Sequence, residues 1–122
     1  MTKIMAVDDQ ADIIRLLQRI LEGAGYEFVG YFTGEECLEK YEKEKPDLIL
    51  LDVWLPGLDG WQVYERIKKI NDKQKIAFLS ALGIGPKTSV KLLKEGIKDY
   101  ISKPFEPHEL LEKVKEILER PK

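Results

Sequence analysis

The sequence holds only one cysteine, one histidine and two methionines among its 122 residues. Because Cys37 is alone, no disulfide can form within the chain, and nothing indicates an oxidising compartment. We interpret Cys37 as a small apolar residue on a helix face rather than a reactive thiol. The scarcity of sulfur and imidazole ligands also gives no indication of a transition-metal site.

Long apolar runs are missing as well. The longest fall far short of the ~20 residues that a bilayer-spanning helix needs, and the N-terminus carries no apolar signal-peptide core. Neither sign of charge dominates, because the chain has 20 Lys and Arg residues and 22 Asp and Glu residues, which gives a net charge of −2. This balance gives no general reason to bind nucleic acid or an acidic membrane. We therefore expect a cytoplasmic protein with no membrane partner and no direct nucleic-acid partner.

The residues that are present alternate between strand-like and helix-like patterns. Short apolar runs predict strands at 4–7, 26–31, 48–51, 76–79 and 99–102. Apolar residues at helical spacing, with capping and turn signals, predict helices over 13–23, after the Thr33–Glu36 capping box, after the 56–60 turn, over 86–95 and after Pro107. Strict alternation favours a doubly wound α/β fold, a parallel sheet with helices on both faces. A chain of this length fits one domain of about 100–150 residues, so we expect a single domain over 1–122 with no output domain.

Charged side chains stand where several of the predicted strands end. Asp8 and Asp9 follow the first strand, Asp52 follows the third, and Lys103 follows the fifth. In a parallel α/β sheet these ends lie along one edge, where ligands bind. Clustered carboxylates suit a hard cation, and a lysine opposite them supplies a counter-charge for a phosphoryl group. The carboxylates and the lysine at this edge therefore predict a site for a cation and a phosphoryl group.

Six short motifs extend this interpretation. They are Val7-Asp8-Asp9, Leu50-Leu51-Asp52, Pro56-Gly57-Leu58-Asp59-Gly60, Ser80-Ala81, Asp99-Tyr100 and Lys103-Pro104-Phe105. No single motif is specific, but with all six in register the whole chain resembles the receiver domain of two-component response regulators. It is similar to stand-alone receivers of the chemotaxis-regulator or phosphorelay kind. The resemblance implies a flavodoxin-like fold with five helices and strand order 2-1-3-4-5, which sets Asp8 and Asp9 beside Asp52.

The resemblance also implies a role for each residue of this edge. Asp52 would be the phosphoacceptor, taking a phosphoryl group from a histidine kinase, a histidine phosphotransfer protein or a small phosphodonor. Mg²⁺ would be held by Asp9, Asp52 and the backbone carbonyl of Trp54, with Asp8 nearby and acting mostly through water. Lys103 would contact the phosphoryl group as a mobile point charge.

The same resemblance implies how the signal would leave the site. Ser80 would bond a phosphoryl oxygen, and the ring of Tyr100 would follow into the space that Ser80 leaves. This movement would remodel the face formed by the helix over 86–95, the strand over 99–102 and the last helix. A downstream protein is expected to bind that face. Tyr100 as a packed strand aromatic with no switching role is the alternative.

Two further expectations come from the family pattern. The Lys103–Pro104 bond is usually cis in receivers, and a cis X–Pro bond costs only about 0.5–1 kcal/mol over trans. Trp54 and Leu82 occupy positions that are often polar in regulators that lose phosphate quickly. We therefore expect slow autodephosphorylation, with the Trp54 ring as a cover over the site.

Other functions of this constellation have distinct requirements. The chain is expected to be a signalling domain that catalyses its own phosphotransfer rather than an enzyme. A haloacid-dehalogenase-like phosphatase would place a second acid two residues after the nucleophile, where this chain has Trp54. A flavin-binding protein would need Gly, Ser or Thr to bind the flavin phosphate in the loop where this chain has Asp8 and Asp9. A phosphate-independent scaffold, and Asp9 as a mere helix cap, are the remaining alternatives.

Overall fold

The computed structural model describes residues 1–80 and 100–121, with Ser80 described by its backbone only. Its elements are β1 (Lys3–Val7), α1 (Ala11–Gly23), β2 (Glu27–Tyr31), α2 (Gly34–Glu44), β3 (Leu48–Asp52), α3 (Gly60–Ile70), β4 (Lys75–Ser80), β5 (Tyr100–Ser102) and α5 (Pro107–Glu119). The helix predicted over 86–95 lies outside the described residues. Each of the other predicted elements is present, with bounds that differ by one or two residues.

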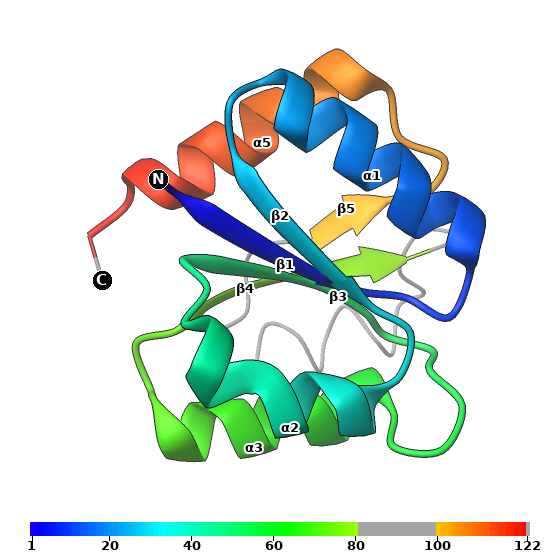
Figure 1. The fold of residues 1–122 in the computed structure, drawn as a ribbon, viewed down its shortest axis with the longest axis vertical. Helices are drawn as coiled ribbons and strands as arrows, with labels where there is room; N and C mark the ends of the chain where they lie inside the picture. The colour runs from blue at the N-terminus through cyan, green and yellow to red at the C-terminus, as the bar shows by residue number, and fades with distance from the viewer. Residues whose placement is uncertain (81–99, 122) are drawn as a thin grey trace.

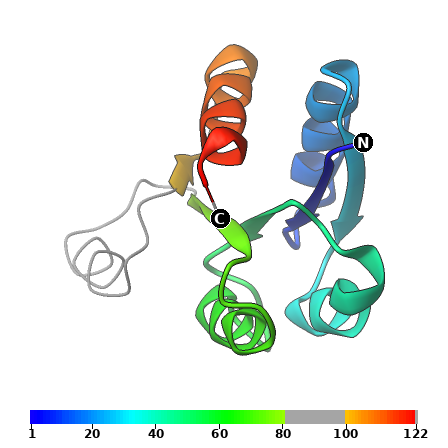
Figure 2. The same cartoon turned by 90° about the vertical axis from the view of Figure 1, so that its left-hand side faces the viewer.

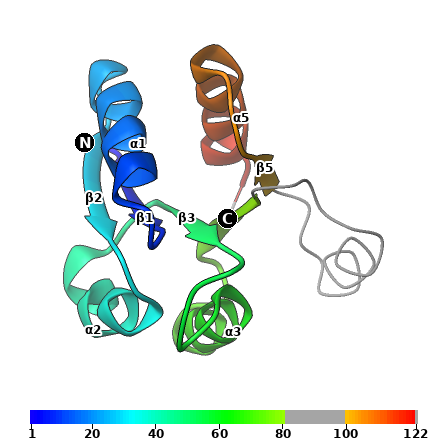
Figure 3. The same ribbon diagram turned by 90° about the vertical axis from the view of Figure 1, so that its right-hand side faces the viewer.

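The strands form one parallel sheet in the order β2-β1-β3-β4-β5, as predicted. Figure 1 shows α1 and α5 on one face of this sheet and α2 and α3 on the other. The side views in Figures 2 and 3 show the same three layers edge-on. The flavodoxin-like α/β prediction is confirmed.

The central strand β3 is buried along its whole length. Its side chains alternate between two cores: Ile49 and Leu51 pack with α2 and α3, whereas Leu48 and Leu50 pack with α1 and α5. Fully burying one such side chain contributes roughly 1.5–3 kcal/mol. A continuous apolar run is what a strand covered on both faces requires. Asp52, the last residue of β3, is therefore carried by a strand whose whole length is packed between the two helical layers.

Helices α2 and α3 each begin at a residue whose side chain caps the helix. Thr33 Oγ1 accepts the Glu36 N–H at 3.1 Å, as the predicted capping box requires. The Glu36 carboxylate, however, accepts from the Phe32 N–H at 3.2 Å rather than from the Thr33 N–H, so the box closes one residue early. A complete capping box starts α3, where Asp59 and Gln62 each accept the other's backbone N–H. The Asp-x-x-Gln pattern that signals it begins at Asp59, inside the motif interpreted above only as a turn, and ends at Gln62, two residues beyond that motif.

Cys37 lies on the inner face of α2 and is fully buried. Its Sγ is 3.7 Å from Met5 Sδ, and burial raises the pKa of the thiol to about 12. A thiolate is the nucleophilic form of cysteine, so a pKa this high leaves the side chain inert. The structure agrees with the interpretation of Cys37 as an apolar packing residue.

Candidate functional site

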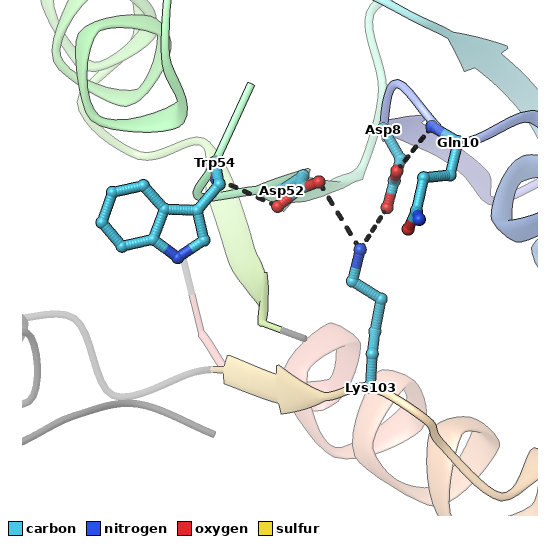
Figure 4. Close-up of polar contacts among 5 residues, drawn as sticks. All are labelled: Asp8, Gln10, Asp52, Trp54 and Lys103. Atoms are coloured by element: carbon cyan, nitrogen blue, oxygen red, sulfur yellow. Dashed lines mark hydrogen bonds and ion pairs between the residues drawn. The ribbon is translucent and has the colours of Figure 1, made fainter. Parts of the chain in front are cut away.

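The chemically active side chains meet at the edge where the strands end. Asp8 follows β1 and Asp52 ends β3, and these strands are neighbours whose residues Val7 and Leu51 pair in register. Lys103 follows β5 and reaches toward both carboxylates, as Figure 4 shows. The predicted juxtaposition of Asp8 with Asp52 is therefore present.

The Asp52 carboxylate is buried and oriented from two sides. Its Oδ1 accepts the backbone N–H of Trp54 at 3.0 Å, and its Oδ2 is 3.5 Å from Lys103 Nζ. Burial is the main cause that raises the pKa of Asp52 above its ordinary value, and the negative charge of Asp8 adds to it. The Trp54 N–H and the Lys103 charge act in the opposite direction. The site thus holds a desolvated carboxylate in a fixed direction, and a cation would favour its charged form.

Lys103 makes its shorter contact with Asp8. Its Nζ is 2.7 Å from Asp8 Oδ2, and both side chains are buried. The other Asp8 oxygen, Oδ1, accepts the backbone N–H of Gln10 at 2.9 Å. The Lys103–Pro104 peptide bond is cis, as predicted. The sequence predicted that Lys103 would contact a phosphoryl group, but it did not predict the ion pair between Lys103 and Asp8.

Three carboxylates form an oxygen-only cluster at this edge. Asp8, Asp9 and Asp52 each offer one carboxylate oxygen, and these oxygens all lie within 4.8 Å of one another. Asp9 is exposed, whereas Asp8 and Asp52 are buried. When all are ionised, three negative charges face the single positive charge of Lys103, which leaves a local charge of −2. This donor set fits Mg²⁺, which prefers oxygen ligands and keeps several waters.

Asp9 does not cap α1. The residue at the N-cap position is Gln10, and its side chain makes no capping hydrogen bond. The interpretation of Asp9 as a mere helix cap is therefore wrong. An exposed carboxylate beside two buried ones is instead available to a solvated ion.

Comparison with known proteins places this arrangement in a family. The response regulator receiver domain family matches residues 4–115. The chain belongs to this family. As a receiver domain it is a signalling domain of two-component systems, and receiver domains of response regulators interact with histidine kinases and effector domains.

Relatives of this receiver domain differ in length. It is 44% identical over 118 residues to PhoP, the alkaline phosphatase synthesis transcriptional regulatory protein of Bacillus subtilis, covering 97% of this chain and 49% of PhoP. It is 35% identical over 116 residues to the chemotaxis protein CheY of Thermotoga maritima, covering 94% of this chain and 96% of CheY. The chain thus spans about half of PhoP and nearly all of CheY.

A solved structure supports the same fold. The crystal structure of a CheY-like receiver domain protein from Methanospirillum hungatei superposes with a TM-score of 0.88 at 36% identity, covering 97% of this chain and 94% of that one.

None of the helices in the described ranges, 1–80 and 100–121, has the length and apolar character of a membrane span.

Ser80 and Tyr100, the two residues predicted to transmit the signal, belong to the neighbouring strands β4 and β5. Ser80 ends β4 opposite Ser102 of β5, and its side chain lies outside the described part of the chain, as does Leu82. Tyr100 opens β5 with 47% of its surface exposed, beside a groove of about 440 Å³ that Phe105 also lines. The switching roles of Ser80 and Tyr100 stay predictions.

The Trp54 side chain does not cover the site. Trp54 is 67% exposed, and Figure 4 shows its indole on the far side of Asp52 from Lys103. What Trp54 contributes directly is its backbone N–H on Asp52. Main-chain donors of this kind, including that of Gln10, carry no sequence signal, so sequence reasoning missed both.

Proposed function

We propose that this receiver domain is a phosphorylation-dependent switch in which Asp52 accepts the phosphoryl group. The observation that carries the proposal is the convergence of a buried, oriented carboxylate, an oxygen cluster and a buried lysine at one sheet edge. A histidine kinase or a histidine phosphotransfer protein is the proposed donor. The cytoplasmic location and the single domain over 1–122 stay predictions.

The geometry supports transfer to an oxygen of Asp52. The Trp54 N–H engages Oδ1 at 3.0 Å, whereas Oδ2 has the longer contact, 3.5 Å from Lys103 Nζ. One carboxylate oxygen attacks phosphorus, an acyl phosphate bond forms, and the bond to the donor's nitrogen or oxygen breaks. Positioning and charge stabilisation supply most of the catalysis in phosphoryl transfer.

The chain's own residues are arranged to hold the charges of this reaction. Asp9, Asp52 and the Trp54 carbonyl would hold Mg²⁺, with Asp8 acting mostly through water. When bound, the ion would offset the repulsion between carboxylates and phosphoryl oxygens. Lys103 keeps its tight pairing with Asp8 while its longer contact, 3.5 Å to Asp52, leaves it free to meet a phosphoryl oxygen.

Neither the phosphatase nor the flavin-binding alternative gains support from the site. A phosphatase of the haloacid-dehalogenase type needs an acid at the position of Trp54, whose indole here points to solvent. A flavin phosphate would meet Asp8 and Asp9 where it needs neutral donors. The acidic loop suits a cation.

Phosphorylation itself is the test of this proposal. With acetyl phosphate and Mg²⁺, we expect the intact chain to gain one phosphoryl mass, and chelation of the metal should remove the gain because the carboxylate cluster then repels the donor. Intact-mass spectrometry over time measures this. If no phosphoryl mass appears with acetyl phosphate or with any histidine kinase of the source organism, the phosphoacceptor role is wrong.

Signal output is proposed to run through Tyr100. Its exposed ring, beside the groove on the β5–α5 edge, is expected to turn inward together with the Ser80 hydroxyl when Asp52 is modified. Structures with and without beryllofluoride, a phosphoryl mimic, provide the measurement. Identical Tyr100 rotamers in both would reject this switch and leave the segment 83–86 as the better candidate for signalling.

Slow loss of the phosphoryl group is expected for the wild-type chain. Hydrolysis needs a water aligned opposite the Asp52 oxygen, and neither Trp54 nor Leu82 offers a carboxylate or amide to hold it. Loss of one such hydrogen bond slows hydrolysis by roughly 10–100-fold, or about 1.4–2.7 kcal/mol of barrier. The decay of the phosphorylated form after donor removal is compared among wild type, Trp54→Asn, Leu82→Glu and the double variant that carries both substitutions. Equal decay of the wild type and the double variant would contradict the expectation.

A further inference from the structure

The backbone that carries Asp52 is held very close to the first turn of α3. The N–H of Gly60, the first residue of α3, donates to the Val53 carbonyl at 3.1 Å. A Cβ atom at Gly60 would lie 2.2 Å from the Asp52 carbonyl oxygen and 2.9 Å from Val53 Cα. Atoms at these separations would overlap, and both are main-chain atoms that cannot rotate away. Only glycine permits this approach.

The other side of the same backbone is held by β4. Asp52 pairs in register with Leu79, and the Val53 N–H donates to the Leu79 carbonyl at 3.2 Å. The Val53 side chain is buried, so it cannot shift without disturbing the core. The backbone of Asp52–Trp54 is therefore held between β4 on one side and Gly60 on the other, an arrangement that we call the clamp. At its end, the Trp54 N–H donates to the Asp52 carboxylate at 3.0 Å.

We infer that Gly60 is a positioning residue for the phosphoacceptor: by lacking a side chain it lets α3 fix the backbone of Asp52–Trp54, and thereby the direction of the Asp52 carboxylate and the Trp54 carbonyl. This inference deepens the proposed function and rests on it for its catalytic consequence. The clamp itself is a property of the metal-free protein.

The effect of Gly60→Ala distinguishes this role from an ordinary helix position. Gly60 does not have a left-handed backbone, and alanine is the better helix former, so without the close approach Gly60→Ala would stabilise the chain. With the approach, the Asp52 carbonyl or the start of α3 must move. A displacement of about 1 Å at a reacting group can cost on the order of 100-fold in rate.

A matched control exists at Gly30 in β2. A Cβ atom there would lie 2.6 Å from Ile14 Cγ2 and 3.2 Å from Phe28 Cε2, so Gly30→Ala also overpacks the protein, but against side chains away from Asp52. Both variants are expected to lose thermal stability. Only Gly60→Ala is expected to disturb the phosphoacceptor.

The experiment has two readouts on the 122-residue wild type, Gly60→Ala and Gly30→Ala. In metal-free protein, ¹⁵N-resolved hydrogen exchange of the Trp54 amide is expected to quicken at least about tenfold in Gly60→Ala and to stay unchanged in Gly30→Ala. With acetyl phosphate and Mg²⁺, phosphorylation of Gly60→Ala is expected to slow at least about tenfold while that of Gly30→Ala stays near wild type. Unchanged exchange of the Trp54 amide in Gly60→Ala would overturn the inference. Equal effects of the two variants on amide exchange or on the phosphorylation rate would overturn it as well.

A milder variant covers the case in which Gly60→Ala does not fold. Asp59→Ala removes the side chain that caps α3 and loosens its first turn without adding an atom at Gly60. Faster exchange of the Trp54 amide in Asp59→Ala supports the clamp, and unchanged exchange overturns it. A wild type that takes up no phosphoryl group defeats the proposed function alone, because the amide readout needs neither metal nor donor.

Discussion

Replacing Asp52 with asparagine is expected to abolish phosphorylation of the chain. The amide has nearly the same shape, and its oxygen can still accept the Trp54 N–H, while Lys103 keeps its 2.7 Å contact with Asp8. An amide, however, is a far weaker nucleophile than a carboxylate and carries no charge for a metal ion. We therefore expect uptake of phosphoryl mass from acetyl phosphate to fall by more than about 1,000-fold, about 4 kcal/mol of barrier, which is below detection.

Asp72→Asn is the matched control for this substitution. Asp72 is an exposed aspartate in the turn between α3 and β4, at the opposite end of the sheet from Asp52. The control makes the same chemical change and is expected to take up phosphoryl mass at the wild-type rate. Uptake by Asp52→Asn at that rate would assign the nucleophile to another residue.

Removing Asp9 is expected to weaken Mg²⁺ binding with little effect on folding. Its carboxylate is exposed, whereas Asp8 and Asp52 are buried with Lys103 between them, so Asp9→Ala leaves the buried contacts in place. Loss of an oxygen ligand is expected to raise the dissociation constant for Mg²⁺ on the order of 10- to 100-fold. Tryptophan fluorescence during Mg²⁺ titration measures it, because Trp54 adjoins the cluster.

Asp12→Ala serves as the control for Asp9→Ala. Asp12 is also exposed and lies in the first turn of α1, where its carboxylate pairs with Arg15 rather than with the cluster. Its replacement removes the same charge a few residues away and is expected to change Mg²⁺ affinity only slightly. If Asp9→Ala binds Mg²⁺ as tightly as Asp12→Ala does, Asp9 is not a ligand.

Much of the fold could be predicted because burial leaves a direct trace in the sequence. The uninterrupted apolar run of β3 predicted a strand covered on both faces, and the ends of the strands predicted one edge rich in carboxylates. The resemblance supplied the strand order, which brings Asp8 beside Asp52. These features depend on side-chain type and spacing, which a sequence shows.

The finer geometry of the site depends on the backbone, which leaves no such trace. Nothing in the residue types reveals that the Trp54 and Gln10 N–H groups orient the two carboxylates, or that Lys103 lies closer to Asp8 than to Asp52. The close approach of Gly60 to the Asp52 backbone is likewise visible only in three dimensions. A glycine after an aspartate is interpreted first as part of a turn.

The location of the phosphoryl group in the wild-type chain tests the role of Asp52 most directly. Acyl phosphates are reduced by borohydride, which converts a phosphorylated aspartate into homoserine and leaves free carboxylates unchanged. After treatment with acetyl phosphate and Mg²⁺, reduction and peptide mapping by mass spectrometry, we predict homoserine at Asp52 and at no other aspartate. Homoserine at Asp8 or Asp9, with Asp52 unmodified, would contradict the account.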